Sequence, residues 1–277
     1  SDLMEPLSRA MLSLEGLSVG DAYGQAGGRD APWPTTDDTE MASAVVEVLD
    51  ECGRILPDRL AAAFLRRWRL DPHRGYAAGA RELLERLDAG EGWEAAAAGL
   101  FGGRGSFGNG AAMRAAPVGA FFAEDPARVA DEALLSAMPT HAHPEGRSGA
   151  VAVALAAAAV WRGEPIFEAV LAGTPEGVVS RNVESAAALG PGAPVEGAAL
   201  RLGAGARVIA QDTVGFALWC AARHLHDYGA AVRAAVSSGG DADTIAAIVG
   251  GIVALAVGLE GIPPIWREAR EPLRTRP

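Results

Sequence analysis

Two segments of the sequence, residues 151–161 and 245–259, are apolar on nearly every side. The second is bounded by Asp243 before it and by Glu260 after it. A transmembrane helix needs about 20 predominantly apolar residues, and both segments are shorter. A helix that is hydrophobic all round is otherwise buried in the core of a large domain. The two segments therefore predict central helices of an α-helical protein and no membrane span.

Most of the remaining sequence consists of runs rich in Ala, Leu, Val, Arg and Glu, separated by short Gly/Pro stretches, which is typical of successive helices. Residues 61–68 place apolar side chains at helical spacing, and Arg66, Arg67 and Arg69 are expected on the opposite face. Alternating, strand-like segments are scarce, and neither a polar linker nor a clear internal repeat divides the chain. We predict an all-α fold with one domain over residues 1–277.

The composition excludes several classes of protein. The formal net charge is −11, and no basic patch of the kind that grips nucleic-acid backbones is evident. Cys52 and Cys220 lie in apolar stretches without the spacing of a zinc or redox site, so we expect buried thiols. No apolar leader is evident at the start, which predicts a cytoplasmic protein. We also expect a monomer.

The first acidic segment, residues 35–41, lies between a Pro/Gly-rich loop and a helical run. It contains Thr36, Asp37 and Asp38, and adjacent carboxylates repel one another unless something compensates their charge. At the start of a helix such residues can cap free amides and meet the favourable end of the dipole. Taken alone, the segment is therefore explained best by capping.

A second segment repeats this pattern, with Asp241, Asp243 and Thr244 at the start of the apolar run 245–259. Capping explains one aspartate but not two such segments far apart in the chain. Carboxylates and hydroxyls are hard oxygen ligands, suited to Mg²⁺, Mn²⁺ or Ca²⁺ and poorly suited to zinc. If the segments meet in space, bound cations would neutralise the carboxylates, and two ions could be bridged.

Residues 102–110 form a glycine-rich segment before a helical run. Glycines let backbone amides approach a ligand closely, and amides at a helix start can receive phosphate oxygens. Neither standard phosphate motif is present, so a flexible surface loop is an equally good interpretation. Residues 140–144 carry His141 and His143, whose spacing does not place them on one helical face. Metal ligation is not expected there; His141 facing a ligand and His143 capping a helix is one interpretation, and structural roles for both are the other.

Taken together, these segments resemble the ADP-ribosylglycohydrolase family. The matching blocks are residues 16–24, 36–41, 106–114, 140–141, 240–247 and 261–263. The resemblance implies a compact, mostly orthogonal bundle of helices. It also implies hydrolysis of the glycosidic bond between ADP-ribose and a protein side chain or small molecule, releasing ADP-ribose with the help of two divalent cations, Mg²⁺ or alternatively Mn²⁺.

The resemblance assigns roles to particular residues. The implied metal ligands are Thr36, Asp37, Asp38, Asp241, Asp243 and Thr244, of which Asp38 and Asp243 are also expected to be catalytic. The implied substrate-binding residues are Gly105, Ser106, Phe107, Gly108, Asn109, Gly110, Met113 and His141. Within this set, residues 106–110 are expected around the phosphates and distal ribose, and His141 on the adenosine side.

Two positions depart from the pattern of the family. Many relatives have a glutamate four residues beyond Gly24, where this sequence has Gly28. Because that glutamate is a candidate for activating water, Asp30, Asp38 or Glu40 would have to serve instead, or the protein binds its ligand without cleaving it. Some arginine-specific bacterial relatives have an aspartate at the position of Ser106, which favours a serine or other non-arginine linkage. A hydrolase of another nucleotide-derived glycoside is the third alternative.

Overall fold

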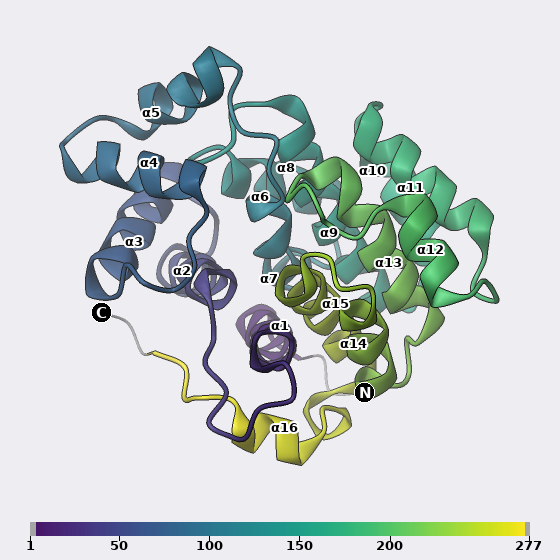
Figure 1. Cartoon of the computed structure of the whole chain (residues 1–277). Helices are drawn as coiled ribbons and strands as arrows, with labels where there is room; N and C mark the ends of the chain where they lie inside the picture. Colours follow the sequence, from purple (N-terminus) through teal and green to yellow (C-terminus); the bar gives the residue numbers. More distant parts are fainter. Residues whose placement is uncertain (1–3, 275–277) are drawn as a thin grey trace.

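Helices α1 (Pro6–Ala26) and α15 (Ala242–Val257) lie side by side at the centre of the molecule (Figure 1). The structure is a computed structural model, and it describes residues 4–274. Both helices are seen nearly end-on in Figure 1, whereas α4 (Ala78–Asp88) and α5 (Trp93–Gly99) lie across the view. Helices of this bundle therefore cross at large angles.

Glycines allow the two central helices to approach closely. Gly16, Gly20 and Gly24 are spaced four residues apart, so they lie on one face of α1. A Cβ atom built on Gly20 would lie 2.2 Å from the carbonyl oxygen of Ala246, and one on Gly24 would lie 2.7 Å from the Cα atom of Asp243. No side chain fits between these backbones. The contact therefore fixes the depth and register at which α15 lies against α1.

Two shells of helices surround this pair. The helices with the most extensive contacts to α1 or α15 are α2 (Asp37–Cys52), α7 (Ala116–Phe121), α9 (Pro144–Arg162), α13 (Val214–Arg223) and α14 (Tyr228–Ser237). The helices that pack on this first shell are α3 (Pro57–Leu70), α8 (Pro126–Ala137), α10 (Ile166–Gly173), α11 (Val178–Leu189) and α12 (Val195–Leu202). Shorter elements are η1 (Leu100–Gly103), α6 (Gly110–Met113), η2 (Ala210–Asp212), η3 (Leu259–Gly261) and α16 (Pro264–Ala269).

The expected all-α fold is confirmed, because residues 4–274 form helices and loops without a β-strand. The two apolar segments belong to α9 and α15, and both helices are buried along most of their length. None of the described helices combines the length and hydropathy needed to cross a membrane. Cys220 is a buried thiol as expected, whereas Cys52 is only half-buried.

The amphipathic helix expected around residues 61–68 is α3, but one of its arginines is placed differently from the prediction. Arg67 is only 4% exposed and lies on the inner face of α3. It donates to Glu40 at 3.2 Å and to Glu47 at 3.4 Å, both on α2. The buried carboxylates of α2 therefore stabilise the charge of Arg67 in the interior. The residue spacing of α3 alone predicts instead that Arg67 faces solvent.

Helices α4 and α5 and the turn η1 form a satellite unit at the edge of the bundle, at the upper left of Figure 1. Leu83, Ala96, Ala97 and Leu100 form a small hydrophobic cluster that is separate from the main core. Leu87 and Ala142 pack against this cluster. We call α4, α5 and η1 together the satellite cluster.

Replacing Gly20 by alanine is expected to lower the free energy of unfolding by about 3 kcal/mol or more, because the added methyl group meets backbone that cannot move aside. Chemical unfolding followed by circular dichroism measures this change. Gly197→Ala is the matched control, since Gly197 is an exposed glycine of α12 and a Cβ atom there meets nothing within 4 Å. The control should be neutral or stabilising. Equal stability of the two variants would contradict a glycine-dependent contact.

Candidate active site

The first acidic segment begins α2, and its threonine accounts for the capping. Thr36 is the N-cap residue, and its hydroxyl accepts a hydrogen bond from the amide of Asp38 at 3.2 Å. Asp37 and Asp38 follow in the first turn, and both are buried. Because the Thr36 hydroxyl provides the cap, the carboxylates of Asp37 and Asp38 are not needed as N-cap acceptors.

The second acidic segment begins α15 and meets the first directly. Asp241 occupies the N-cap position without making a side-chain cap, and Asp243 follows in the first turn. The Thr244 hydroxyl donates to the carboxylate of Asp38 at 2.9 Å, although the two residues are 206 positions apart in the sequence. The structure therefore brings the two segments into one place.

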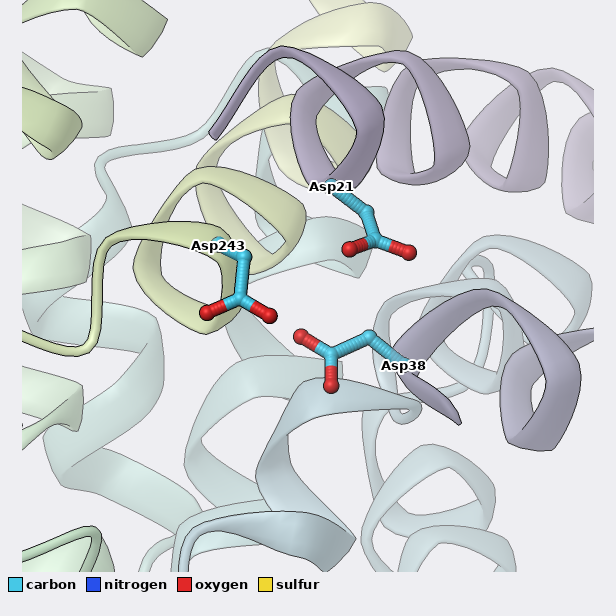
Figure 2. Close-up of side chains that lie close together, drawn as sticks. All are labelled: Asp21, Asp38 and Asp243. Atoms are coloured by element: carbon cyan, nitrogen blue, oxygen red, sulfur yellow. The ribbon is translucent and has the colours of Figure 1, made fainter. Parts of the chain in front are cut away.

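A third helix contributes Asp21, which lies in the family-like block at residues 16–24 but was not predicted as a metal ligand. One oxygen each of Asp21, Asp38 and Asp243 lies within 4.8 Å of the others. Figure 2 shows the three carboxylates pointing toward one another from α1, α2 and α15. We call these three residues the acidic cluster.

Asp21 also holds the start of α2 in position. Its carboxylate accepts hydrogen bonds from the amide and hydroxyl of Thr36, each at 2.8 Å, and from the hydroxyl of Thr39 at 2.6 Å. Asp21 is completely buried in α1. Its place in the family-like block at residues 16–24 was the sequence signal that could have identified it.

Burial and mutual repulsion raise the pKa values of Asp21, Asp38 and Asp241. Burial, followed by the charge of Asp37, raises the pKa of Asp38 well above its usual range. Burial raises the pKa of Asp21 to about 7, although hydrogen bonds to its carboxylate oppose the shift. The pKa of Asp241 is likewise raised to about 7. A divalent cation fits this set of oxygen donors, because its charge would stabilise the ionised carboxylates.

A cavity of about 520 Å³ opens beside the acidic cluster. It is lined by most of the predicted residues, namely Asp37, Asp38, Ser106, Phe107, Gly108, Asn109, Gly110, Met113, His141, Asp241, Asp243 and Thr244. Thr36 and Gly105 are not among the lining residues. A Cβ atom on Gly105 would lie 2.7 Å from the backbone nitrogen of His143, so this glycine allows the loop to pack closely against the backbone of His143.

Other parts of the wall were not predicted. The satellite cluster contributes Ala78, Gly79, Ala80, Leu83, Leu100 and Phe101, and the adjoining wall is formed by Gly75 and Ala77. Arg207, Val208 and Ile209 line another part. Phe101 and Val208 have positive φ angles of 53° and 59°, which side-chain-bearing residues rarely adopt. Such backbone geometry cannot be read from hydrophobic spacing.

The glycine-rich loop is ordered by pairing with the chain around Val208. The amide of Asn109 donates to the carbonyl of Val208 at 3.0 Å, and the amide of Ala210 donates to the carbonyl of Phe107 at 3.0 Å. Ser106 accepts from the amide of Gly108 at 3.1 Å. The segment is therefore a fixed part of the cavity wall rather than a free surface loop.

Asn109 connects this loop to the second acidic segment. Its side-chain amide donates to Asp241 at 2.8 Å and to the Thr213 hydroxyl at 3.1 Å. The loop and a candidate metal ligand are thus held by one neutral side chain, whose amide oxygen has no hydrogen-bond partner within residues 4–274.

The two histidines have different environments. His143 caps α9, because its Nδ1 accepts from the amide of Glu145 at 3.0 Å. His141 lines the cavity, and its Nδ1 lies 2.6 Å from the hydroxyl of Thr140, which also accepts from Arg114 at 2.7 Å. Burial, and then the charge of Arg114, lowers the pKa of His141 to about 3. The His141 ring is therefore neutral near pH 7.

The positions considered for activating water differ in their exposure and in whether they line the cavity. Gly28 and Asp30 are exposed and do not line the cavity, whereas Asp38 does. Glu40 is buried, with Arg67 at 3.2 Å and Arg274 at 3.7 Å. These ion pairs occupy the Glu40 carboxylate and favour a structural role for it.

Replacing Asn109 by alanine is expected to weaken Mn²⁺ binding about 10- to 100-fold, the usual effect of removing a partner that orients a metal ligand. Isothermal titration calorimetry with Mn²⁺ alone measures the affinity. Ser106→Ala is the control, because Ser106 lies in the same loop but bonds only to Gly108 among the described residues. A dissociation constant for Asn109→Ala equal to that of the control would show that Asp241 needs no such partner.

Comparisons with known proteins agree with this geometry. The family described as ADP-ribosylglycohydrolase matches residues 2–276. The ADP-ribosylhydrolase ARH3 of Homo sapiens is 30% identical over 275 residues, covering 85% of this chain and 74% of the human protein. That of Gallus gallus is 28% identical, covering 93% of this chain and 80% of the chicken protein.

A solved structure described as an ADP-ribosylglycohydrolase-related protein complex has the same fold. It superposes with a TM-score of 0.68 at 28% identity, covering 96% of this chain and 93% of the other. The family match spans nearly the whole sequence. The chain therefore belongs to the ADP-ribosylglycohydrolase family.

Proposed function

We propose that the protein is a divalent-metal-dependent hydrolase that cleaves the glycosidic bond between ADP-ribose and a protein side chain or small molecule. The observation that carries this proposal is one cavity lined both by the acidic segments and by the glycine-rich loop, with Asn109 of that loop bonded to Asp241. An ADP-ribosyl substrate has a matching order of groups, since its diphosphate lies between adenosine and the distal ribose.

The cations proposed for this site are two Mg²⁺ ions, with Mn²⁺ as the alternative. The residues that would hold them are Thr36, Asp37, Asp38, Asp241, Asp243 and Thr244. Bound ions of this kind polarise substrate oxygens and lower the pKa of water. Asp21 would support the site without being one of these ligands, because its hydrogen bonds to Thr36 hold the first acidic segment in position.

The protein's own groups then orient the substrate. Asp38 and Asp243 face the cavity from two helices and are the proposed catalytic carboxylates, which position the distal ribose and the attacking water. The loop at residues 106–110 is assigned to the diphosphate and distal ribose. The adenosine is assigned to the region of neutral His141 and the apolar wall, where planar and uncharged groups are favoured.

A second candidate is a family member that binds ADP-ribose without cleaving it. The observation that favours it is Gly28, which stands where many relatives have a glutamate, in an exposed loop away from the cavity. Turnover therefore depends on whether the carboxylates that line the cavity suffice to activate water.

A panel of ADP-ribosylated arginine, ADP-ribosylated serine and small-molecule ADP-ribosides, assayed with Mg²⁺, Mn²⁺ or EDTA, tests this proposal. We expect release of ADP-ribose from at least one substrate, and its loss in EDTA. Detectable ADP-ribose binding without turnover on any substrate would instead support the binding-only candidate.

Asp38→Asn and Asp243→Asn are expected to lower kcat/KM on the order of 100-fold or more, since each removes a charged oxygen ligand. The readout is release of ADP-ribose at saturating Mg²⁺. Asp131→Asn is the matched control, because Asp131 is exposed on α8, and its kcat/KM should equal that of the wild type. Full activity of both active-site variants would refute the assigned roles.

A further inference from the structure

We propose that Glu271, in the segment after α16, is a positioning residue that holds the first acidic segment in its cation-binding geometry. Glu271 does not line the cavity and contacts none of the candidate ligands. It acts through Thr35 and Arg74. This inference rests on the proposed metal site but does not depend on hydrolysis or on the identity of the substrate.

The segment that carries Glu271 is attached to the chain just before α2. The amide of Trp33 donates to the carbonyl of Ala269 at 2.7 Å, and the amide of Glu271 donates to the carbonyl of Trp33 at 2.9 Å. Trp33 and Arg270 thereby form an isolated parallel bridge. Residues 33 and 271 are thus held together by backbone, which fixes the point from which the Glu271 side chain extends.

One oxygen of Glu271 receives three donors. The amide and the hydroxyl of Thr35 donate to its Oε1 at 2.8 and 3.0 Å, and Arg74 donates to the same atom. Thr35 directly precedes the candidate ligand Thr36. Glu271 therefore fixes the chain one residue before the ligands begin.

Arg74 connects Thr35 to the turn at residues 71–75 and to the start of α2. Its guanidinium also donates to the carbonyl of Thr35 at 2.9 Å and to Asp71 at 2.8 Å. Its own carbonyl accepts the amide of Asp37 at 2.8 Å. A Cβ atom on the next residue, Gly75, would lie 3.8 Å from the Asp37 carboxylate, so this turn borders that ligand.

A second contact from the same segment supports the turn. Arg274 donates to Asp71 at 2.8 Å and lies 3.7 Å from Glu40 on α2. The turn at residues 71–75 is thus held against α2 by ion pairs from outside the cavity. Without the Glu271 carboxylate, Thr35 loses two hydrogen bonds and Arg74 loses one of its two carboxylate partners, which loosens the attachment of Thr35 and of the turn whose carbonyl accepts the Asp37 amide.

The substitutions Glu271→Ala and Glu271→Gln test this role, with Mn²⁺ alone as the ligand in calorimetry. We expect Glu271→Ala to weaken Mn²⁺ binding about 10-fold. Glu271→Gln should weaken it less, since an amide oxygen still accepts from Thr35 but carries no charge for Arg74. Glu268→Ala is the matched control, because Glu268 is an exposed glutamate of α16, and its affinity should equal that of the wild type.

Hydrogen exchange in metal-free protein separates positioning from a general loss of stability. In Glu271→Ala, a peptide covering residues 33–41 should exchange faster than in wild type, while one covering residues 242–250 of α15 should be unchanged. Glu271→Gln provides the same comparison should the alanine variant fail to fold. Unchanged Mn²⁺ affinity in the folded Glu271 variants, or equal acceleration in both peptides, would overturn the proposal. Failure of the hydrolysis assay alone would leave these measurements unaffected.

Discussion

The close contact between α1 and α15 is the constraint on which the rest of the structure depends. Where three glycines of α1 face the backbone of α15, the helices approach without intervening side chains. The same contact brings Asp21 and Asp243 together, because each lies at the end of its helix nearest α2. Packing in the core thus determines the spacing of charges in the cavity. The apolar core stabilises the helices while their carboxylates repel one another.

The charges around the site are arranged in two layers. Within residues 4–274, the carboxylates of the acidic cluster form no ion pair with an arginine. Asp21 accepts hydrogen bonds from two threonine hydroxyls and one backbone amide, and Asp38 accepts one from the Thr244 hydroxyl. Arginines instead pair with Glu40, Asp71 and Glu271 behind the cluster. Neutral donors orient the inner carboxylates without cancelling their charge, which leaves that charge available to a cation. The outer ion pairs hold the elements that carry them.

Sequence patterns predicted the features that depend on local order along the chain. Helical periodicity predicted the all-α fold and the burial of α9 and α15, and repeated acidic segments predicted residues that do lie together at one cavity. Asp21 was missed as a member of the cluster because a lone aspartate within a helix has no distinctive spacing. Arg67 was misplaced because its partners lie on another helix. The positive φ angle of Val208 depends on tertiary contacts that no local pattern encodes.

The satellite cluster has a consequence for how the cavity behaves in solution. Its small hydrophobic cluster consists of four buried side chains, and Leu84 is its one buried residue in the main core, so separating it from the bundle exposes much less apolar surface than global unfolding does. Local opening is therefore expected at a lower free energy than loss of the whole fold. The acidic segments, in contrast, begin α15 of the central pair and α2, which packs directly on that pair. Thermal fluctuations should alter the width of the apolar side of the cavity while the spacing of the carboxylates is preserved.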